Sequence, residues 1–188
     1  IETISEIKKI KSKKIKIYFQ KKVGFGNAIA EGLQRIDSEY FCLMMADGSQ
    51  KPTEIKPMFE EIINSKFDFI FGSRYVRNKS GSDDDTLITF IGNKLFTLLG
   101  KLFFNIKLSD ILYTFVIGKT LKVNNLNLSQ EDFRICVELP IKVKMNKYLY
   151  KSYPCYERKR YGGTKKVNAF KDGSLILIYM LKSFLKIK

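Results

Sequence analysis

The sequence predicts an α/β domain in which a mostly parallel sheet is flanked by helices. An unbroken apolar run, Phe41–Ala46, is too short for a typical helix, and continuous apolarity is typical of a strand covered on both faces of a parallel sheet. The run stops at Asp47, which is followed by turn residues. In open α/β sheets the ligand lies beyond the carboxyl ends of the strands, so we expect Asp47 at the rim of a site. The alternative is that Asp47 caps an ordinary strand end.

The first elements follow from local periodicity. Residues 1–11 place isoleucines at helical spacing with lysines on the other side, and residues 13–19 alternate like a short strand. Gly24 and Gly26 open a helix that extends to about Ile36. Two glycines before a helix can cradle a phosphate, and the alternative is a tight turn without ligand contact. Because the chain begins within a helix, we expect a further N-terminal segment, with a first strand, before Ile1.

A second rim residue follows the next strand. The sequence predicts a helix from Pro52 to about Asn64 and a strand over Phe67–Phe71, which ends in Gly-Ser-Arg-Tyr. Arg74 would then lie at the same rim as Asp47. The planar guanidinium of an arginine can make two hydrogen bonds to a phosphate at once, and the alternative is a surface salt bridge.

The middle of the chain combines a polar loop with an apolar helix. Residues 78–86 are rich in glycine and serine and include the aspartates 83–85, a pattern typical of a mobile lid or a solvated tip rather than a metal cluster. Phe90–Phe104 is apolar on nearly every side, interrupted by Lys94 and Lys101, which indicates a buried helix or one at a membrane interface. No uninterrupted apolar run reaches the length of about 18 residues expected of a transmembrane helix.

Composition restricts the chemistry. At 188 residues and 45% hydrophobic composition, one domain with its own core is expected. The chain has no histidine, which excludes Ser-His-Asp triads and histidine-bound zinc. Its three cysteines form no CxxC pair, which favours a reducing cytoplasmic setting. A net charge of +15 favours an anionic partner, but the scattered lysines form no stripe that would suit a nucleic acid.

Several motifs together resemble family 2 inverting glycosyltransferases, especially the dolichyl-phosphate mannose synthase-like branch. The metal-binding segment of that family, Met-Asp-Ala-Asp-x-Ser/Gln-x-x-Pro, is matched by Met44, Ala46, Asp47, Ser49 and Pro52. The first aspartate of the pattern is replaced by Met45. The resemblance implies a GT-A-like fold, with Gly24, Gly26, Ala46 and Arg74 at the substrate. It also implies Mg²⁺ or Mn²⁺ held by Asp47 and Ser49, in a site that Met45 should weaken.

Three later positions complete the resemblance. Asp110 aligns with an aspartate that the family places after the apolar helix, although the Ser-Gly-Phe-Arg expected next is absent. Glu138 lies where many members present a catalytic or acceptor-side carboxylate. Arg160 and Lys166 match an Arg-x-x-Gly-x-Ser-Lys motif, in which Lys165 takes the serine position. The resemblance therefore implies catalytic roles for Asp47, Asp110 and Glu138, and substrate contacts for Arg160 and Lys166.

The implied reaction moves a sugar from a nucleotide sugar, with inversion, to a membrane-associated acceptor. A polyprenyl phosphate is already an anion at neutral pH and needs no base, whereas a glycan hydroxyl needs a carboxylate such as Glu138 or Asp110. The basic C-terminal motif favours the phosphate, and the absence of a second arginine after the polar loop favours the hydroxyl. Met45 also motivates a third interpretation, a catalytically degenerate member that binds a nucleotide sugar without turnover.

The end of the sequence predicts a membrane contact. We expect residues 1–173 to form the glycosyltransferase domain and residues 174–188 to form an amphipathic helix whose lysines cluster at one end. Such a helix can lie on an anionic membrane surface, and the alternative is that it docks on the core of its own domain. This contact would place the protein in the cytoplasm, at the cytoplasmic face of a membrane.

Overall fold

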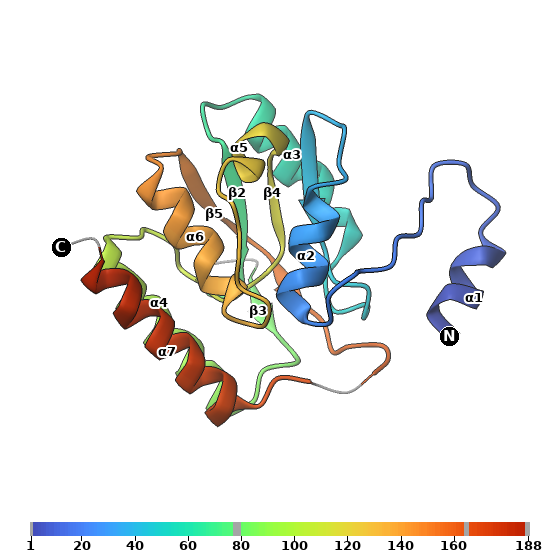
Figure 1. The fold of residues 1–188 in the computed structure, drawn as a ribbon. Coiled ribbons are helices and arrows are strands. Elements are labelled where there is room, and N and C mark those ends of the chain that lie inside the picture. The colour runs from blue at the N-terminus through green and yellow to red at the C-terminus, as the bar shows by residue number, and fades with distance from the viewer. Residues whose placement is uncertain (1, 77–79, 164–165, 187–188) are drawn as a thin grey trace.

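The computed structural model describes residues 2–76, 80–163 and 166–186, with side chains from Ile4 onward, and contains a central sheet covered by helices (Figure 1). The strands lie in the order β1 (Tyr40–Leu43), β4 (Val116–Lys119), β2 (Phe69–Ser73) and β5 (Tyr150–Pro154). β4 is antiparallel to β1 and β2, and β2 is parallel to β5. In this sheet β1, β2 and β5 therefore run in one direction, which confirms the expected mostly parallel arrangement with β4 as the exception.

Alternation along the strands divides the interior into two apolar clusters. Phe69 and Phe71 of β2 face the larger cluster, while Ile70 between them faces the smaller one. In β4, Val116 and Ile117 divide in the same way. Successive side chains of a strand point to opposite faces, so a continuous apolar run means that both faces of the sheet are covered.

The two faces are covered by different helices. On the larger cluster lie α2 (Phe25–Leu33), α5 (Thr120–Asn124) and α6 (Ile135–Met145), while α3 (Ile55–Ile63) covers the other face after the short turn η1 (Pro52–Glu54). The predicted helices over residues 24–36 and 52–64 correspond to α2 and to η1 with α3. Both have an apolar face buried in the core, as Met58 and Ile62 of α3 show.

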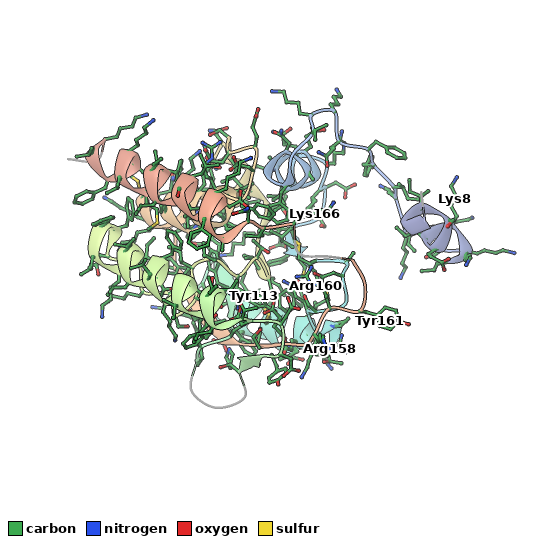
Figure 2. All side chains as sticks on the ribbon, turned by 90° about the horizontal axis from the view of Figure 1, so that it is seen from below. Lys8, Tyr113, Arg158, Arg160, Tyr161 and Lys166 are labelled. Atoms are coloured by element: carbon green, nitrogen blue, oxygen red, sulfur yellow. The ribbon has the colours of Figure 1, made fainter. Side chains whose placement is uncertain are left out.

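An outer layer is formed by α4 (Leu87–Phe104) and α7 (Ala169–Leu185), which lie side by side (Figures 1 and 2). α4 begins at a capping box between Thr86 and Thr89. Phe103 of α4 stacks on Phe184 of α7 with ring centroids 4.9 Å apart. Ile176 and Met180 of α7 are buried in the larger cluster. One face of the terminal helix therefore docks on the domain, as the alternative interpretation required.

The outer faces of α4 and α7 remain apolar. Their exposed large hydrophobic residues, here called the α4/α7 face, are Leu87, Ile88, Phe90, Ile91, Leu95, Leu98 and Leu102 of α4, and Phe170, Leu177, Ile178, Leu181 and Leu185 of α7. Within the described residues, α4 is long and apolar enough to cross a membrane by length and composition, and 22% of it is buried. Lys94 and Lys101 interrupt its apolar sequence. For this reason the sequence contains no uninterrupted apolar run of transmembrane length. The core helix of a soluble protein can have the same length and composition.

Two segments differ from the sequence expectation. Residues 13–19 form no strand, because no described strand lies beside them to pair with, and Ile15, Ile17 and Phe19 are exposed. They link α1 (Glu2–Lys9), which stands apart from the body of the domain in Figure 1, to the rest of the chain. The predicted lid, whose residues 78 and 79 lie outside the described ones, contains β3 (Gly81–Ser82), which pairs with β6 (Tyr156–Glu157). This pairing fixes the aspartate-rich loop to the segment after β5.

Candidate active site

A pocket of about 450 Å³ lies beyond the carboxyl ends of β1 and β2, where the sequence places the binding site. Its charged lining residues come from four separate segments: Asp47, Arg74, Asp84 with Asp85, and Glu157 with Arg160 and Lys166. The structure thus brings together five of the predicted residues, namely Asp47, Ser49, Arg74, Arg160 and Lys166. Met45 also lines the pocket. Ala46 does not line it, although its two neighbours do.

The carboxylate of Asp47 is held on both sides. Its Oδ1 accepts hydrogen bonds from the backbone N–H of Ser49 at 3.0 Å and from the Ser49 hydroxyl at 2.8 Å. Its Oδ2 lies 3.6 Å from Nη1 of Arg160. The backbone N–H of Met45 donates to Oε1 of Gln50 at 2.8 Å, which braces the turn after β1. One oxygen of Asp47 is therefore occupied by the turn after β1, while the other faces the guanidinium of Arg160.

Residues 158–163, here called the arm, lie directly on the turn that carries Asp47. The backbone N–H groups of Arg158 and Tyr161 donate to the carbonyl oxygens of Ser49 and Asp47, each at 2.8 Å. Gly48 has a φ of +80°, and a Cβ atom there would lie 3.0 Å from Cβ of Tyr161. Only a residue without a side chain fits this close approach comfortably. Figure 2 shows Arg160 and Lys166 beside the body of the domain, while Tyr161 points outward.

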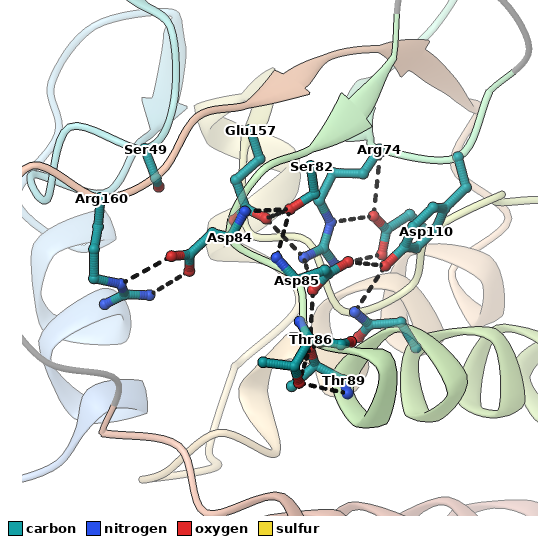
Figure 3. Close-up of polar contacts among 12 residues, drawn as sticks. Ser49, Arg74, Ser82, Asp84, Asp85, Thr86, Thr89, Asp110, Glu157 and Arg160 are labelled. Carbon is teal, nitrogen blue, oxygen red and sulfur yellow. Dashed lines mark hydrogen bonds and ion pairs between the residues drawn. The ribbon is translucent and has the colours of Figure 1, made fainter.

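Arg74 is the centre of a buried ionic cluster (Figure 3). Its Nε and Nη2 donate to the two oxygens of Asp110 at 2.7 and 3.1 Å, and its Nη1 donates to Glu157 at 3.1 Å and to Asp85 at 3.4 Å. The side chain is 8% exposed. Burial alone would lower the pKa of Arg74, but Asp110 and then Glu157 raise it well above its usual range. Arg74 is thus paired with carboxylates, in a buried network rather than the surface salt bridge considered as the alternative.

Asp110 lies behind Arg74 instead of in the pocket. Its side chain is fully buried, and it accepts hydrogen bonds from the backbone N–H of Arg74 as well as from the guanidinium. It is not among the residues that line the pocket. Asp110 therefore positions Arg74 instead of taking the expected catalytic role. Its carboxylate accepts from three donors of Arg74 and is covered by that side chain, so it cannot reach an acceptor hydroxyl.

Glu138 is also far from the position expected of a base. This fully buried residue of α6 accepts from the backbone N–H groups of Ser129 and Gln130 at 3.0 and 2.9 Å and from the Ser129 hydroxyl at 3.0 Å. Its carboxylate also pairs with Lys142 at 2.8 Å. Glu138 does not line the pocket. We therefore correct the sequence expectation: Glu138 fixes the loop before α6 to that helix.

The glycine turn before α2 contacts protein rather than open space. The N–H groups of Gly26 and Asn27 both donate to the carbonyl oxygen of Glu131. A Cβ atom on Gly26 would lie 2.0 Å from the carbonyl oxygen of Gln130, and one on Gly24 would lie 2.3 Å from that of Glu131. These glycines allow close packing on the loop before α6, which corresponds to the tight turn without ligand contact. A phosphate cradle needs free N–H groups, and the two that donate to Glu131 are occupied.

Sequence reasoning missed the acidic lining contributed by the polar loop and β6. Asp84 accepts from Nη2 of Arg160 at 2.9 Å, and Asp85 accepts from the Tyr75 hydroxyl at 2.5 Å (Figure 3). Glu157 accepts from the Ser82 hydroxyl at 2.6 Å. The aspartates 83–85 were a visible signal in the sequence. Their position, however, depends on the pairing of β3 with β6, which joins segments more than 70 residues apart.

Several solved structures share the fold of this chain. A solved structure described only as a mycobacterial protein superposes with a TM-score of 0.62 at 10% identity, covering 91% of this chain and 53% of that one. Glucosyl-3-phosphoglycerate synthase from Mycobacterium tuberculosis in complex with UDP superposes with a TM-score of 0.61 at 11% identity, covering 87% of this chain and 55% of that one. The same enzyme with Mn²⁺ and UDP-glucose gives 0.57 at 9% identity, covering 90% and 56%. The fold is therefore GT-A-like, and the chain spans about half the length of these structures.

The sequence match is to the family described as Glycosyl transferase family 2, over residues 2–124. Because this match covers more than half of the chain, the protein belongs to that family. No curated protein that was compared matches the chain in sequence. The finer likeness to the dolichyl-phosphate mannose synthase-like branch stays a prediction.

Proposed function

We propose that this protein transfers a sugar, with inversion, from a nucleotide sugar to a membrane-associated acceptor. The observation that carries the proposal is the convergence of Asp47, Arg74, Arg160 and Lys166 on one pocket at the strand ends. Membership of glycosyl transferase family 2 supports the reaction class. Two of the solved structures named above contain UDP or UDP-glucose, which supports a nucleotide sugar as donor.

The reaction requires one displacement at the anomeric carbon of the donor sugar. An acceptor oxygen forms a bond to that carbon while the bond between the carbon and the diphosphate oxygen breaks. The electron pair of the broken bond leaves with the nucleoside diphosphate. Positive charge at the diphosphate stabilises this leaving group. The cationic groups lining the pocket that solvent reaches most readily are Arg160 and Lys166, because Arg74 is buried among carboxylates.

For the acceptor, the α4/α7 face favours a lipid-linked molecule, and a polyprenyl phosphate remains our first candidate. Exposed apolar surface of this extent on adjoining helices is typical of a protein or membrane contact. The pairing of Arg74 with three carboxylates favours the second candidate, a glycan hydroxyl, because this guanidinium is not free to bind an acceptor phosphate. A hydroxyl acceptor would need a base from the pocket, where Asp84, Asp85 and Glu157 provide carboxylates in place of Glu138 and Asp110.

Metal use was expected from Asp47 and Ser49, and one solved relative contains Mn²⁺. A divalent ion supplies positive charge to the leaving diphosphate when it is bound. In this chain the Ser49 hydroxyl donates to Asp47, and Met45 offers a thioether in place of a carboxylate. Among the described residues no three Asp, Glu or Cys side chains are grouped to hold a metal ion. The donor set therefore fits a resident ion poorly.

The test is transfer by the full chain, presented with a panel of radiolabelled UDP-sugars and GDP-sugars and with polyprenyl phosphate or a lipid-linked glycan in anionic vesicles. We expect one donor to label the lipid fraction, and we expect an Arg160→Ala variant to lose that labelling. Recovery of label in one acceptor but not the other decides between phosphate and hydroxyl. Donor binding without any transfer would support the catalytically degenerate interpretation, and a chain that neither binds nor transfers any donor would overturn the proposal.

A further inference from the structure

We infer that Arg160 takes the place of the divalent ion in this protein, so that a nucleoside diphosphate binds without metal. The inference deepens the proposed function and rests on it. It concerns the positive charge that binds the diphosphate of the donor. In this protein that charge would be a guanidinium of the arm instead of a divalent ion bound by two carboxylates. Three features of the pocket lead to it, namely the donors around Asp47, the geometry of Arg160 and the attachment of the arm.

The first feature is the shortage of metal ligands at the motif after β1. Of the two carboxylates that the motif would provide, one is replaced by Met45. The remaining carboxylate, Asp47, uses Oδ1 for two hydrogen bonds from Ser49, and only Oδ2 faces the pocket cation. Mg²⁺ and Mn²⁺ prefer oxygen ligands, and a thioether is a poor ligand for them.

The second feature is the cation already facing Asp47. The guanidinium of Arg160 lies between two carboxylates, with Nη1 3.6 Å from Asp47 and Nη2 2.9 Å from Asp84. These contacts raise the pKa of Arg160, with the hydrogen bond that it donates to Asp84 as the largest cause, so the group keeps its charge. About a quarter of the side chain is exposed, which leaves it accessible from the pocket. A planar guanidinium can donate two parallel hydrogen bonds to phosphate oxygens.

The third feature is the attachment that keeps Arg160 in place. Backbone hydrogen bonds on either side of it, from Arg158 to Ser49 and from Tyr161 to Asp47, tie the arm to the turn after β1. Nη2 of Arg158 also donates to the carbonyl oxygen of Gly48 at 3.0 Å. The arm therefore holds Arg160 in position before any donor arrives. Positioned charge is more effective for a leaving group than charge that must be reorganised during the reaction.

The proposed step is balanced without an ion. As the bond between the anomeric carbon and the diphosphate oxygen breaks, the added negative charge on that oxygen is stabilised by hydrogen bonds from Arg160. Asp47 acts as a positioning residue, because it orients the guanidinium through Nη1. Arg160 exchanges part of its contact with Asp84 for hydrogen bonds to the incoming phosphate oxygens.

The test is calorimetric titration of the full chain with UDP and GDP, once in EDTA and once in Mn²⁺. We expect affinity in the two buffers to agree within about threefold. Because hydrogen bonds to charged groups contribute about 1.5–3 kcal/mol, Arg160→Ala should weaken binding by roughly 10-fold to 150-fold in both buffers. Lys159→Ala is the matched control, because it removes the neighbouring charge and Lys159 does not line the pocket. This variant should bind the nucleotide as tightly as the wild-type chain.

A second variant tests the same reasoning in the opposite direction. Met45→Asp supplies the missing carboxylate, so Mn²⁺ should tighten nucleotide binding by this variant. The variant should also bind Mn²⁺ and thereby reduce the electron paramagnetic resonance signal of the free ion, whereas the wild-type chain should not reduce it. If Mn²⁺ tightens binding by the wild-type chain tenfold or more, or if Arg160→Ala binds as well as wild type, the inference is overturned while the proposed function stands. If neither nucleotide binds in either buffer, the proposed function itself fails.

Discussion

Replacement of Glu138 by glutamine separates a structural role from a catalytic one. Glutamine has nearly the same shape, but it lacks the charge and one of the two acceptor oxygens. In the structure that carboxylate accepts from two backbone N–H groups and a hydroxyl, and it pairs with Lys142. The amide NH₂ of the variant would face at least one of these donors. We therefore expect Glu138→Gln to destabilise the fold without affecting donor binding.

The magnitude follows from the hydrogen bonds that glutamine cannot accept. Hydrogen bonds to a charged group contribute about 1.5–3 kcal/mol each, and the variant keeps one acceptor oxygen, so we expect the free energy of unfolding to fall by about 2–4 kcal/mol. Lys142 is 27% exposed and can turn to water, so it adds little to this decrease. For a domain of this size each kcal/mol lowers Tm by about 2–4 °C, which predicts a decrease of roughly 5–15 °C.

The assay is thermal unfolding followed by circular dichroism, with nucleotide affinity measured on the same preparations below Tm. Glu60→Gln is the matched control, because that carboxylate is 53% exposed and lies 3.9 Å from Lys56. The control should change Tm by about 1 °C or less. A Glu138→Gln variant with unchanged Tm and abolished transfer would refute the structural role and restore the catalytic interpretation.

Three further perturbations test the site and its surroundings. Asp110→Asn should cost about 3–5 kcal/mol in urea unfolding, because it leaves a buried guanidinium without its main partner; a decrease below about 1 kcal/mol would mean that the pair is not structural. Gly48→Leu places a side chain at a φ of +80° and against Tyr161 of the arm, so it should loosen the arm. Trypsin should then cleave the variant faster at residues 158–160, and unchanged cleavage would show that the arm does not depend on its close contact with Gly48. Ile91→Glu with Leu181→Glu, on the α4/α7 face, should leave Tm nearly unchanged and reduce flotation with anionic vesicles, whereas equal flotation would exclude this face as the membrane contact.

The sequence by itself determined the elements whose patterns are local. The apolar run before Asp47 became β1, the run before Gly72 became β2, and the amphipathic segment after Pro52 became α3. Strand and helix periodicity report which faces are buried, and that information lies within a few neighbouring residues. Because strands that run in one direction end at the same edge, the positions of Asp47 and Arg74 on one rim also followed from the sequence.

Only the tertiary structure decided the partners of the ionisable side chains. Arg74 pairs with Asp110, 36 residues away, and with Glu157, 83 residues away. Glu138 could not be assigned from its motif, since its role depends on backbone N–H groups of a preceding loop. Residues 13–19 alternate like a strand but have no described neighbour to pair with. Periodicity specifies which residues are buried, whereas pairing across the fold depends on distances that a local pattern does not encode.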